Sequence, residues 1–572
     1  MSTPPISCEG PAPPLPSNND ISGIGVIVNY VGTAGLATLL VMVYYFMVYE
    51  PANDPFRVNG QTEELLSRPN PVDIIILRSL RAALKRIPLT EHIPFGTNKK
   101  TELFFLKLIV MMGDLQVLSG LTILISGFAQ LRSGLATYYW IVIVQLAWFS
   151  CLTHLCCLTL LRNHLYNNAI ERGWRLVAMA TLAILDLVGL GFTGNYHWAF
   201  CSDCDYRNYS QLKESGDAGS MTPAPNDYAI CFMSVAPSGN GAFASMVVAM
   251  LLIILGFCTR VAKLYKPLSV GVFGRFRAHL SIKSRRLLRR VYIYSGANRK
   301  SNLRWNLLYL PLLSIFLMGR FLLDEWSSLF LEVFWLLVSF TWGIAHVNHF
   351  MKQSEVIHFQ FPDDNFDWSF GQVLSVLLLI APVISILESF SGIEDTESDE
   401  VHVSHLTQSL QENLTPSPIN QDPMDPDNDW DRHQPTLKAA FAYFNLVFAI
   451  IYVTVITSPA ASIPQTLFDE WIAVGTFVAP FLGLFGVILL SLSIEPLFSQ
   501  GRIVFPALSI LLTIVWFTTS IAWPAVEGMF IFQFTAPMQV FPFFAGFCYL
   551  MIRHFVDLIA GNCDNNATAS QV

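Results

Sequence analysis

Long apolar stretches recur along the whole chain, and they constrain the fold more than any other feature. A bilayer core is crossed by about 20 mostly apolar residues in a helix. Lipid offers no partners to backbone N–H and C=O groups, so a segment that crosses it must satisfy them internally. Twelve stretches of the required length lie near 22–48, 103–129, 138–161, 175–196, 241–264, 305–323, 328–349, 370–391, 437–457, 471–493, 504–526 and 530–556.

These stretches predict an all-α fold, a polytopic transmembrane helical bundle of about twelve spanning helices. The composition agrees, because only 13% of the residues are charged, against roughly 25% in soluble domains. The apolar run 305–349 is divided by Asp324, Glu325 and Trp326, which predict a tight turn. Residues 527–529 alone separate the last two stretches, so eleven spans is the alternative.

Charges in the loops predict the orientation. Residues 260–304 contain thirteen Lys or Arg and no acidic residue, which predicts a cytosolic loop under the positive-inside rule. The N-terminus is then outside. Residues 394–436 hold eleven Asp or Glu and one Arg, and the order of the predicted spans places them outside too.

The predicted organisation has five parts. They are an outer tail (1–20), a first membrane bundle of about eight helices (21–393), an acidic and partly disordered outer loop (394–436), the last four helices (437–556) and an outer tail (557–572). The first bundle includes an outer cysteine-containing loop, 197–240, and the basic loop 260–304. The plasma membrane and the endomembranes both fit this organisation.

Three N-x-S/T sequons fall in segments that are predicted to lie outside. Their asparagines are Asn208, Asn413 and Asn566. N-glycosylation takes place on surface segments of that side. The sequence therefore predicts a glycoprotein with these three sites.

Cysteines are concentrated in the predicted outer loop 197–240. An oxidising compartment favours disulfides, and we expect Cys231 to pair with Cys201 or Cys204. The alternative is that Cys201 and Cys204 form a redox or zinc pair. No second C-x-x-C completes a zinc site, so no metal site is predicted.

Several polar side chains fall inside the predicted spans. A carboxylate at the bilayer centre costs about 2.5–3.5 kcal/mol on insertion scales, so such groups must face the bundle interior and find partners. The candidate polar cluster consists of Asp114, Gln116, His154, Asp186 and Glu388. Asp114 and His154 lie about half-way along neighbouring spans, which predicts that they are in contact. A proton pathway or substrate pocket and a structural clamp between helices both fit this set.

The lipid bilayer is the first predicted partner. Residues 275–293 alternate basic and apolar side chains, a pattern that attracts anionic lipid by about 1 kcal/mol per basic residue. The alternative is that these charges only set the orientation. A lipophilic small molecule is a further candidate partner. Nothing predicts a nucleic-acid partner, and without a Walker A loop or an H-E-x-x-H sequence no cofactor is predicted.

Four strings carry a resemblance to a known group of proteins. They are Asp20-Ile-Ser-Gly-Ile-Gly-Val26 at the first span, Asp114-Leu-Gln116 in the second, Thr153-His154-Leu155 in the third and Trp368-Ser-Phe-Gly-Gln372 at the eighth. Over roughly residues 20–390 the chain resembles a group of fungal multi-pass membrane proteins of unassigned activity. Some members are associated with specialised-metabolite biosynthesis, such as that of the elsinochromes. The resemblance transfers no catalytic residue.

Three functional hypotheses follow, and they leave open whether the chain is an enzyme. The first is a fungal integral membrane protein that accompanies a specialised-metabolite pathway without assigned catalysis. The second is a membrane-embedded enzyme for a terpenoid or prenylated intermediate, with Asp114, Asp186 and Glu388 as acids and His154 as base. The third is a small-molecule transporter.

Overall fold

The described part of the chain is helical, apart from turns and one isolated β-bridge between Ala136 and Tyr228. The computed structural model describes residues 8, 15, 18–51, 70–85, 99–160, 169–196, 198, 225–233, 241–265, 267–295, 305–360, 368–380, 382, 384, 433–457 and 480–492. Contacts divide the chain into two compact units. Unit 1 comprises residues 1–55, 80–264 and 332–425, and unit 2 comprises 56–79, 265–331 and 426–572.

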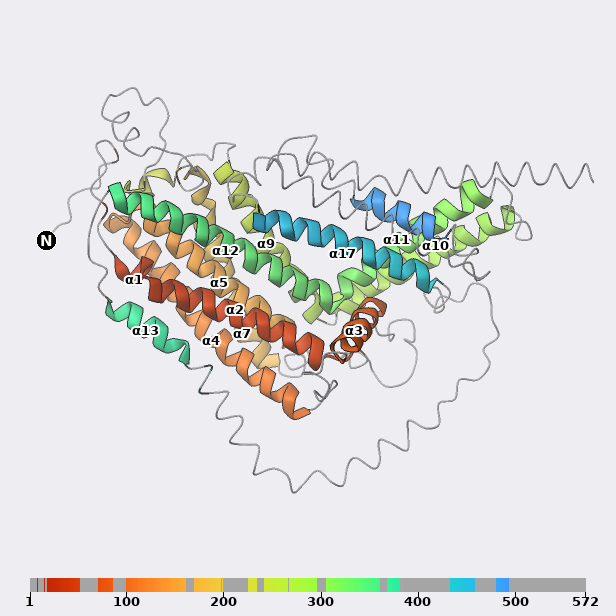
Figure 1. Cartoon of the computed structure of the whole chain (residues 1–572), viewed down its shortest axis with the longest axis horizontal. Coiled ribbons are helices and arrows are strands. Elements are labelled where there is room, and N and C mark those ends of the chain that lie inside the picture. Colours follow the sequence, from red (N-terminus) through yellow and green to blue (C-terminus); the bar gives the residue numbers. More distant parts are fainter. Residues whose placement is uncertain are drawn as a thin grey trace, which may run out of the picture. The chain divides into compact units, whose positions relative to one another are not determined.

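Seven helices build the described part of unit 1 (Figure 1). They are α2 (Ile24–Met47), α4 (Lys99–Gln130), α5 (Thr137–Leu160), α7 (Ala169–Gly191), α9 (Gly241–Leu264), most of α12 (Leu329–Gln360) and α13 (Phe370–Leu378). A short helix, α1 (Asn19–Ser22), precedes α2. Unit 2 contains α10 (Arg275–Tyr294), α11 (Leu310–Ser327), α17 (Gln434–Thr457) and the first half of α3 (Pro71–Leu84).

Seven helical stretches within the described residues are long and apolar enough to cross a membrane. They are Asp20–Met47, Thr101–Ser133, Thr137–Leu160, Ala169–Asn195, Ser245–Leu264, Leu307–Ser327 and Leu329–Asn348. The prediction of an all-α, multi-pass membrane protein is confirmed at this level. The spans predicted at 504–526 and 530–556 lie outside the described residues, as do residues 471–479 of the stretch 471–493.

Helix α5 is the centre of unit 1. Of its most apolar 18-residue window, 94% is buried by the rest of the protein. Helices α2, α4, α7 and α9 all pack against it, and Gly343 of α12 lies against Trp148 and Phe149. A helix enclosed in this way can carry polar side chains that never meet lipid.

Glycines on α4 let it approach α5 closely. Gly113, Gly120 and Gly127 are spaced seven residues apart, so they share one face of the helix. A Cβ atom at Gly120 would lie 2.6 Å from the Cβ of Ser150, and one at Gly113 would lie 2.4 Å from the sulfur of Cys157. At Gly127 a Cβ atom would lie 3.1 Å from the side chain of Ile143 on α5.

The strings Asp20–Val26 and Trp368–Gln372 meet in unit 1. The Asp20 carboxylate accepts a hydrogen bond from the Gly371 N–H at 3.2 Å. A Cβ atom at Gly25 would lie 2.8 Å from the carbonyl oxygen of Gln372. The start of α13 is thus held against the start of α2 by backbone contact, which requires glycine.

A disulfide joins Cys8 to Cys231, with 5.7 Å between their Cα atoms. The predicted pairing of Cys231 with Cys201 or Cys204 is therefore wrong. Cys231 lies in a short 3₁₀ turn, and the residues just before that turn bind the start of α5, where Thr137 N–H donates to Asp227 O at 2.8 Å. The backbone N–H of Asn18 donates to the Tyr139 hydroxyl at 2.9 Å. These contacts bring the N-terminal tail to Cys231. We call this end of unit 1 the disulfide end.

Helix α12 runs opposite to its predicted direction. Lys263 at the end of α9 forms an ion pair of 2.6 Å with Glu332 near the start of α12. At the other end, Ser245 Oγ and His346 Nε2 are 3.1 Å apart. Helices α9 and α12 are therefore antiparallel, whereas the sequence predicted two parallel spans with 305–323 between them.

The start of α13 also lies on the side opposite to the one predicted. It lies at the disulfide end, beside Asp20 and Gly25, whereas the prediction began this helix on the opposite side. Both errors have one physical cause. Residues 265–331 leave unit 1 after α9 and return at Glu332, at the same end, so they add no net crossing.

Buried charge holds the end of unit 1 that lies opposite the disulfide. Arg260 of α9 is only 4% exposed. It donates to Thr159 Oγ1 on α5 at 2.8 Å and to the Glu332 carbonyl at 3.2 Å. One guanidinium thus connects three helices, as its fork of N–H donors allows.

We predict that Gly120→Ala destabilises the protein. The added methyl group would overlap with Ser150, and overpacking typically costs about 1–3 kcal/mol. The measurement is the thermal midpoint of the purified full chain in detergent. Gly173→Ala is the matched control, because nothing lies within 4 Å of a Cβ there and alanine favours a helix by about 0.5–1 kcal/mol. Equal midpoints for the two variants would contradict the close α4–α5 contact.

We also predict that Cys8→Ser lowers stability and that peptide mapping without reductant recovers Cys8 linked to Cys231. The bond spans a sequence separation of 223 residues, for which the chain-entropy model gives about 5 kcal/mol. Cys258→Ser is the control, because Cys258 is a free, exposed thiol. Recovery of Cys231 linked to Cys201 or Cys204 would refute the Cys8 pairing.

Candidate functional site

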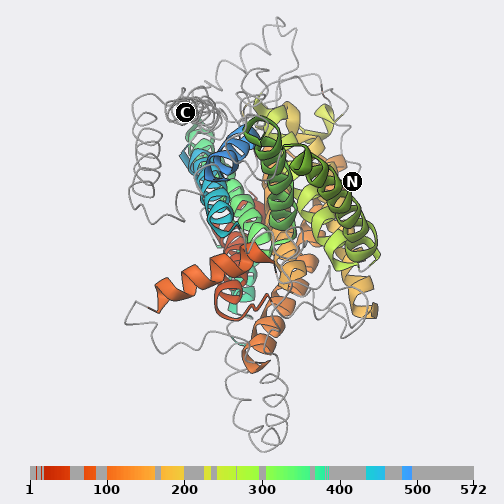
Figure 2. The same cartoon turned by 90° about the vertical axis from the view of Figure 1, so that its right-hand side faces the viewer.

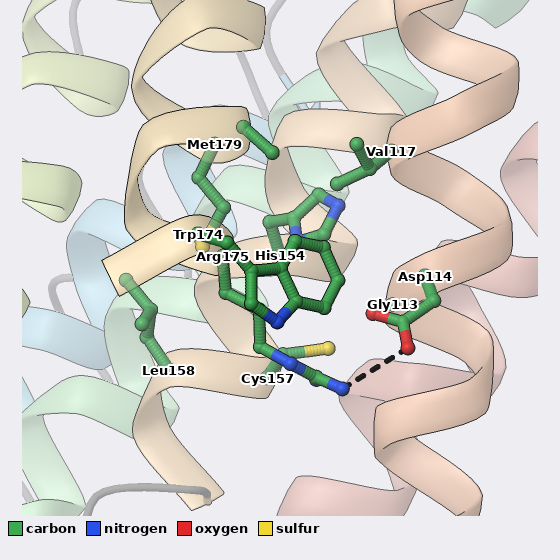
Figure 3. A pocket seen from close by; sticks show the side chains of 10 residues that line it. Gly113, Asp114, Val117, His154, Cys157, Leu158, Trp174, Arg175 and Met179 are labelled. Atoms are coloured by element: carbon green, nitrogen blue, oxygen red, sulfur yellow. Dashed lines mark hydrogen bonds and ion pairs between the residues drawn. The ribbon is translucent and has the colours of Figure 1, made fainter. Parts of the chain in front are cut away.

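Three helices of unit 1 enclose a small cavity between polar side chains (Figure 3). It is lined by Asp114 and Gly113 of α4, His154 and Cys157 of α5, and Arg175 of α7, together with Val117, Leu158, Trp174, Ala178 and Met179. Its volume of about 10 Å³ has room for about one water molecule. The absence of a side chain at Gly113 lets His154 and Cys157 approach α4.

An ion pair forms one wall of this cavity. Arg175 Nη2 lies 3.0 Å from Asp114 Oδ2 and 3.2 Å from Glu171 Oε1. Figure 3 shows Arg175 reaching from α7 to Asp114 on α4. The guanidinium also lies 5.1 Å from the centre of the Trp174 ring, in cation–π range. Asp114 and Arg175 thus form a charged part of the cavity wall, and Glu171 binds the same guanidinium from outside the lining.

His154 is buried and faces two cavities. It is 6% exposed, and its Nε2 has no hydrogen-bond partner among the residues that the structure describes. It lines the cavity beside Asp114 and also a second cavity of about 10 Å³. Buried imidazole nitrogens normally have a partner. A water molecule in either cavity would supply one.

One residue of the second cavity, Cys151, binds a buried carboxyl group. It is lined by Cys151 and His154 of α5, with Leu155, Met179, Leu182, Ala183, Ile253 and Phe257. Cys151 Sγ donates to Asp186 Oδ2 at 3.5 Å, and Asp186 is fully buried. The other oxygen, Oδ1, has no partner within the described part of the chain. The polar groups thus form a line from Asp114 through His154 to Asp186.

Two residues of this line lie near the ends of their helices. Arg175 lies six residues from the first residue of α7, and His154 six residues from the last residue of α5. At 1.5 Å per residue, each is about 9 Å from the helix end opposite the disulfide. The prediction that these groups sit half-way across is therefore wrong for His154. Asp186 lies on α7 about three helical turns further along the helix than Arg175.

Gln116 belongs to a separate contact. Its side-chain oxygen accepts a hydrogen bond from Ser150 Oγ at 2.9 Å, and both residues are buried. This bond joins α4 to α5 beside Gly120, and Gln116 lines neither cavity. Gln116 is therefore a clamp between helices, which was one of the two interpretations of the candidate cluster.

Asp114 and His154 line one cavity, but Asp114 pairs with Arg175 and not with His154. Asp186 lines neither cavity and is connected to the second one through Cys151. Glu388 and the sequons at Asn208, Asn413 and Asn566 lie outside the described residues. Within the ranges that the structure describes, no group of three or more His, Cys, Asp or Glu side chains could hold a metal ion.

Sequence reasoning missed Arg175 and Cys151. Neither residue is in the candidate polar cluster. A signal was present for Arg175, because it lies one helical turn after Glu171 and faces the inside of an otherwise apolar helix. Cys151 offered none, since only the fold brings it to Asp186.

The chain matches no family model, no curated protein and no solved structure.

We predict that Arg175 and Asp114 are energetically coupled. Arg175→Gln leaves the carboxylate without its cation, and Asp114→Asn leaves a guanidinium of which only 11% is exposed with Glu171 alone. Breaking a partly buried pair should cost about 1–3 kcal/mol. The double variant should lose less than the sum of the single variants, as measured by thermal midpoint. Lys107→Gln, at an exposed position of α4, is the control. Additive losses would contradict the pair.

Proposed function

We propose that unit 1 holds a proton pathway and that the chain works as a proton-linked membrane protein, with small-molecule transport as the activity that the pathway would drive. One observation carries the proposal. His154 lines two water-sized cavities, one beside the Asp114–Arg175 pair and the other beside the Asp186–Cys151 pair.

The chemistry of these groups supports proton transfer. Imidazole can bind a proton at one nitrogen and release one from the other. Carboxyl groups accept and release protons when water reaches them. A single water in each cavity would bridge His154 to the groups on either side, since bridging waters are nearly as favourable as direct hydrogen bonds.

The size of the cavities favours protons over larger substrates. A space of about 10 Å³ admits one water molecule and no terpenoid or prenyl chain, whose pockets measure hundreds of Å³. The hypothesis of an enzyme for a lipophilic intermediate, with Asp114 and Asp186 as acids, therefore gains no support from this site. A transporter needs a route for its coupling ion, and such routes are built from buried Asp, Glu and His in membrane helices.

The link to fungal specialised metabolism enters this proposal as the setting of the activity. Its support is the set of resembling strings, two of which, Asp114–Gln116 and Thr153–Leu155, contain the first two groups of the pathway. The other two strings contain the glycines that pack α2 against α13. A proton-driven exporter or importer for a pathway metabolite would fit both parts.

A second proposal concerns the lipid partner and rests on a different observation. Helix α10 carries seven Lys or Arg in twenty residues. Of all the residues in this helix, only Leu288 is buried. We propose that this helix binds anionic headgroups. Each exposed basic residue near such a surface contributes about 1 kcal/mol.

We predict that His154 controls the access of water-borne protons to Asp186. The full chain in liposomes is moved into D₂O, and the infrared band of the protonated carboxyl is followed, identified by its loss in Asp186→Asn. His154→Phe should slow deuteration of this band by about tenfold or more, because the relay step is removed. His346→Gln is the matched control, since His346 is buried but lines neither cavity. Should the Phe variant fail to fold, His154→Gln replaces it. Unchanged exchange in a folded His154 variant would refute the pathway.

A further inference from the structure

The segment 265–331 leaves unit 1 and returns to it at one end. Its boundaries are marked by Lys263, at the end of α9, and Glu332, near the start of α12. These two side chains form an ion pair of 2.6 Å, and both are about nine-tenths buried. The chain therefore departs and re-enters on the same side of the membrane.

Contacts of helix α3 with the end of the segment, near residue 331, support the same side of the membrane. In unit 2, the Asp73 carboxylate accepts hydrogen bonds from the N–H groups of Leu329 and Phe330, each at 3.1 Å. It thereby caps the start of α12, whose first N–H groups lack partners in the helix itself. Asn70 donates to the carbonyl of Asp324 at 2.6 Å. The second half of α3 belongs to unit 1, where Arg81 donates to the carbonyl oxygen of Tyr49 at 2.6 Å, just after the end of α2.

A segment that begins and ends on one side crosses the membrane an even number of times. The long helices of 265–331 are α10 and α11, so either both cross or neither does. They form an antiparallel hairpin, as Figures 1 and 2 show. Arg277 near the start of α10 pairs with Asp324 near the end of α11, and Tyr292 near the end of α10 lies 5.4 Å from Tyr309, ring centre to ring centre.

Helix α10 cannot cross the hydrocarbon core. It carries seven Lys or Arg in twenty residues, and each such residue is costly at the bilayer centre. Of these seven, Arg277 pairs with Asp324, and the exposed ones include Lys283, Arg286, Arg289 and Arg290. Since α10 does not cross, α11 does not cross either, although its length and apolar composition would allow it.

We propose that 265–331 is a helical hairpin on the surface of the membrane and that its occupant is an anionic phospholipid leaflet. The inference rests on the proposed lipid contact of α10 and adds that α11 lies at the same surface. It also removes the predicted span 305–323 from the set of crossings.

The side chains of α10 fit such a surface in both composition and spacing. Its exposed apolar residues include Phe276, Leu280, Leu287 and Tyr294, which repeat at helical spacing along one side. Exposed arginines alternate with them at positions such as Arg290. Apolar side chains of an interfacial helix enter the headgroup region while basic ones bind phosphates. A neutral leaflet would satisfy only the apolar half.

Contacts inside the hairpin give α11 its place beside α10. The Arg285 guanidinium lies 5.4 Å from the centre of the Phe316 ring. The buried residues of α11, including Ser314, Leu317 and Phe321, form one face, and Phe321 lies 5.5 Å from the Phe444 ring of α17, centre to centre. On another face Ile315 is 52% exposed, as expected for a side chain that meets lipid acyl chains near the headgroups.

The topological part is tested by labelling in sealed cells with a membrane-impermeant maleimide. Ile293→Cys marks the tip of the hairpin and Trp326→Cys marks its base, and both positions are exposed. We expect both to react only after the membrane is permeabilised, with the wild-type chain as the control for native thiols. If α11 crossed, the two positions would react from opposite sides. That outcome would overturn the inference even if α10 still bound anionic lipid.

The lipid part is tested on the full chain in nanodiscs. Amide hydrogen exchange of α10 should be several-fold slower with phosphatidylserine present than in phosphatidylcholine alone, and salt should remove the difference. Charge reversal at Arg286, Arg289 and Arg290 should erase it, while Lys107→Glu, on α4, should not. Equal exchange in both lipids would overturn the choice of an anionic leaflet. Protection that appears only when an acidic protein is added would overturn it in favour of a protein partner.

Discussion

The close contact of α4 with α5 is the interaction on which the rest of unit 1 depends. Helices in lipid gain little from the hydrophobic effect on association, so they rely on close packing and on hydrogen bonds. The three α4 glycines, Gly113, Gly120 and Gly127, supply the close packing, and the Gln116–Ser150 bond supplies a polar contact beside them. With α4 this near, the cavity beside His154 is only large enough for one water. A wider separation would admit lipid or more water and would disconnect the polar groups.

A covalent bond stabilises one end of unit 1, and charged side chains stabilise the other. At the disulfide end a covalent bond joins the N-terminal tail to the turn before α9. At the opposite end, Arg175 joins α7 to α4, and Arg260 joins α9 to α5 and α12. Arginines near a helix end can remain charged because water and headgroups are close. The candidate proton pathway begins at this charged end and runs toward Asp186 in the apolar middle.

The sequence predicted the elements of the fold better than their connections. Apolar length identified every described span of unit 1 from α2 to α12, because that signal is local. The direction of α12 was wrong, since hydropathy counts 305–323 as a crossing without knowing that it packs along the basic helix α10. The cluster members Asp114, His154 and Asp186 were found because polar groups in apolar helices are conspicuous. Their partners, Arg175 and Cys151, were not, because pairing depends on how helices face one another. The prediction of the disulfide pairing was wrong for the same reason, since spacing alone does not determine connectivity among several cysteines.

The bond between Cys8 and Cys231 also imposes an order of assembly. It turns the first four membrane helices, α2, α4, α5 and α7, into a single covalent ring with a sequence separation of 223 residues. The ring can close only after Cys231 has followed α7 in synthesis, when all four of these helices have already been made. The two later helices, α9 and α12, complete the enclosure of α5 from outside the ring. A cut anywhere between the two cysteines would therefore leave the fragments joined, and the bundle would come apart only after reduction.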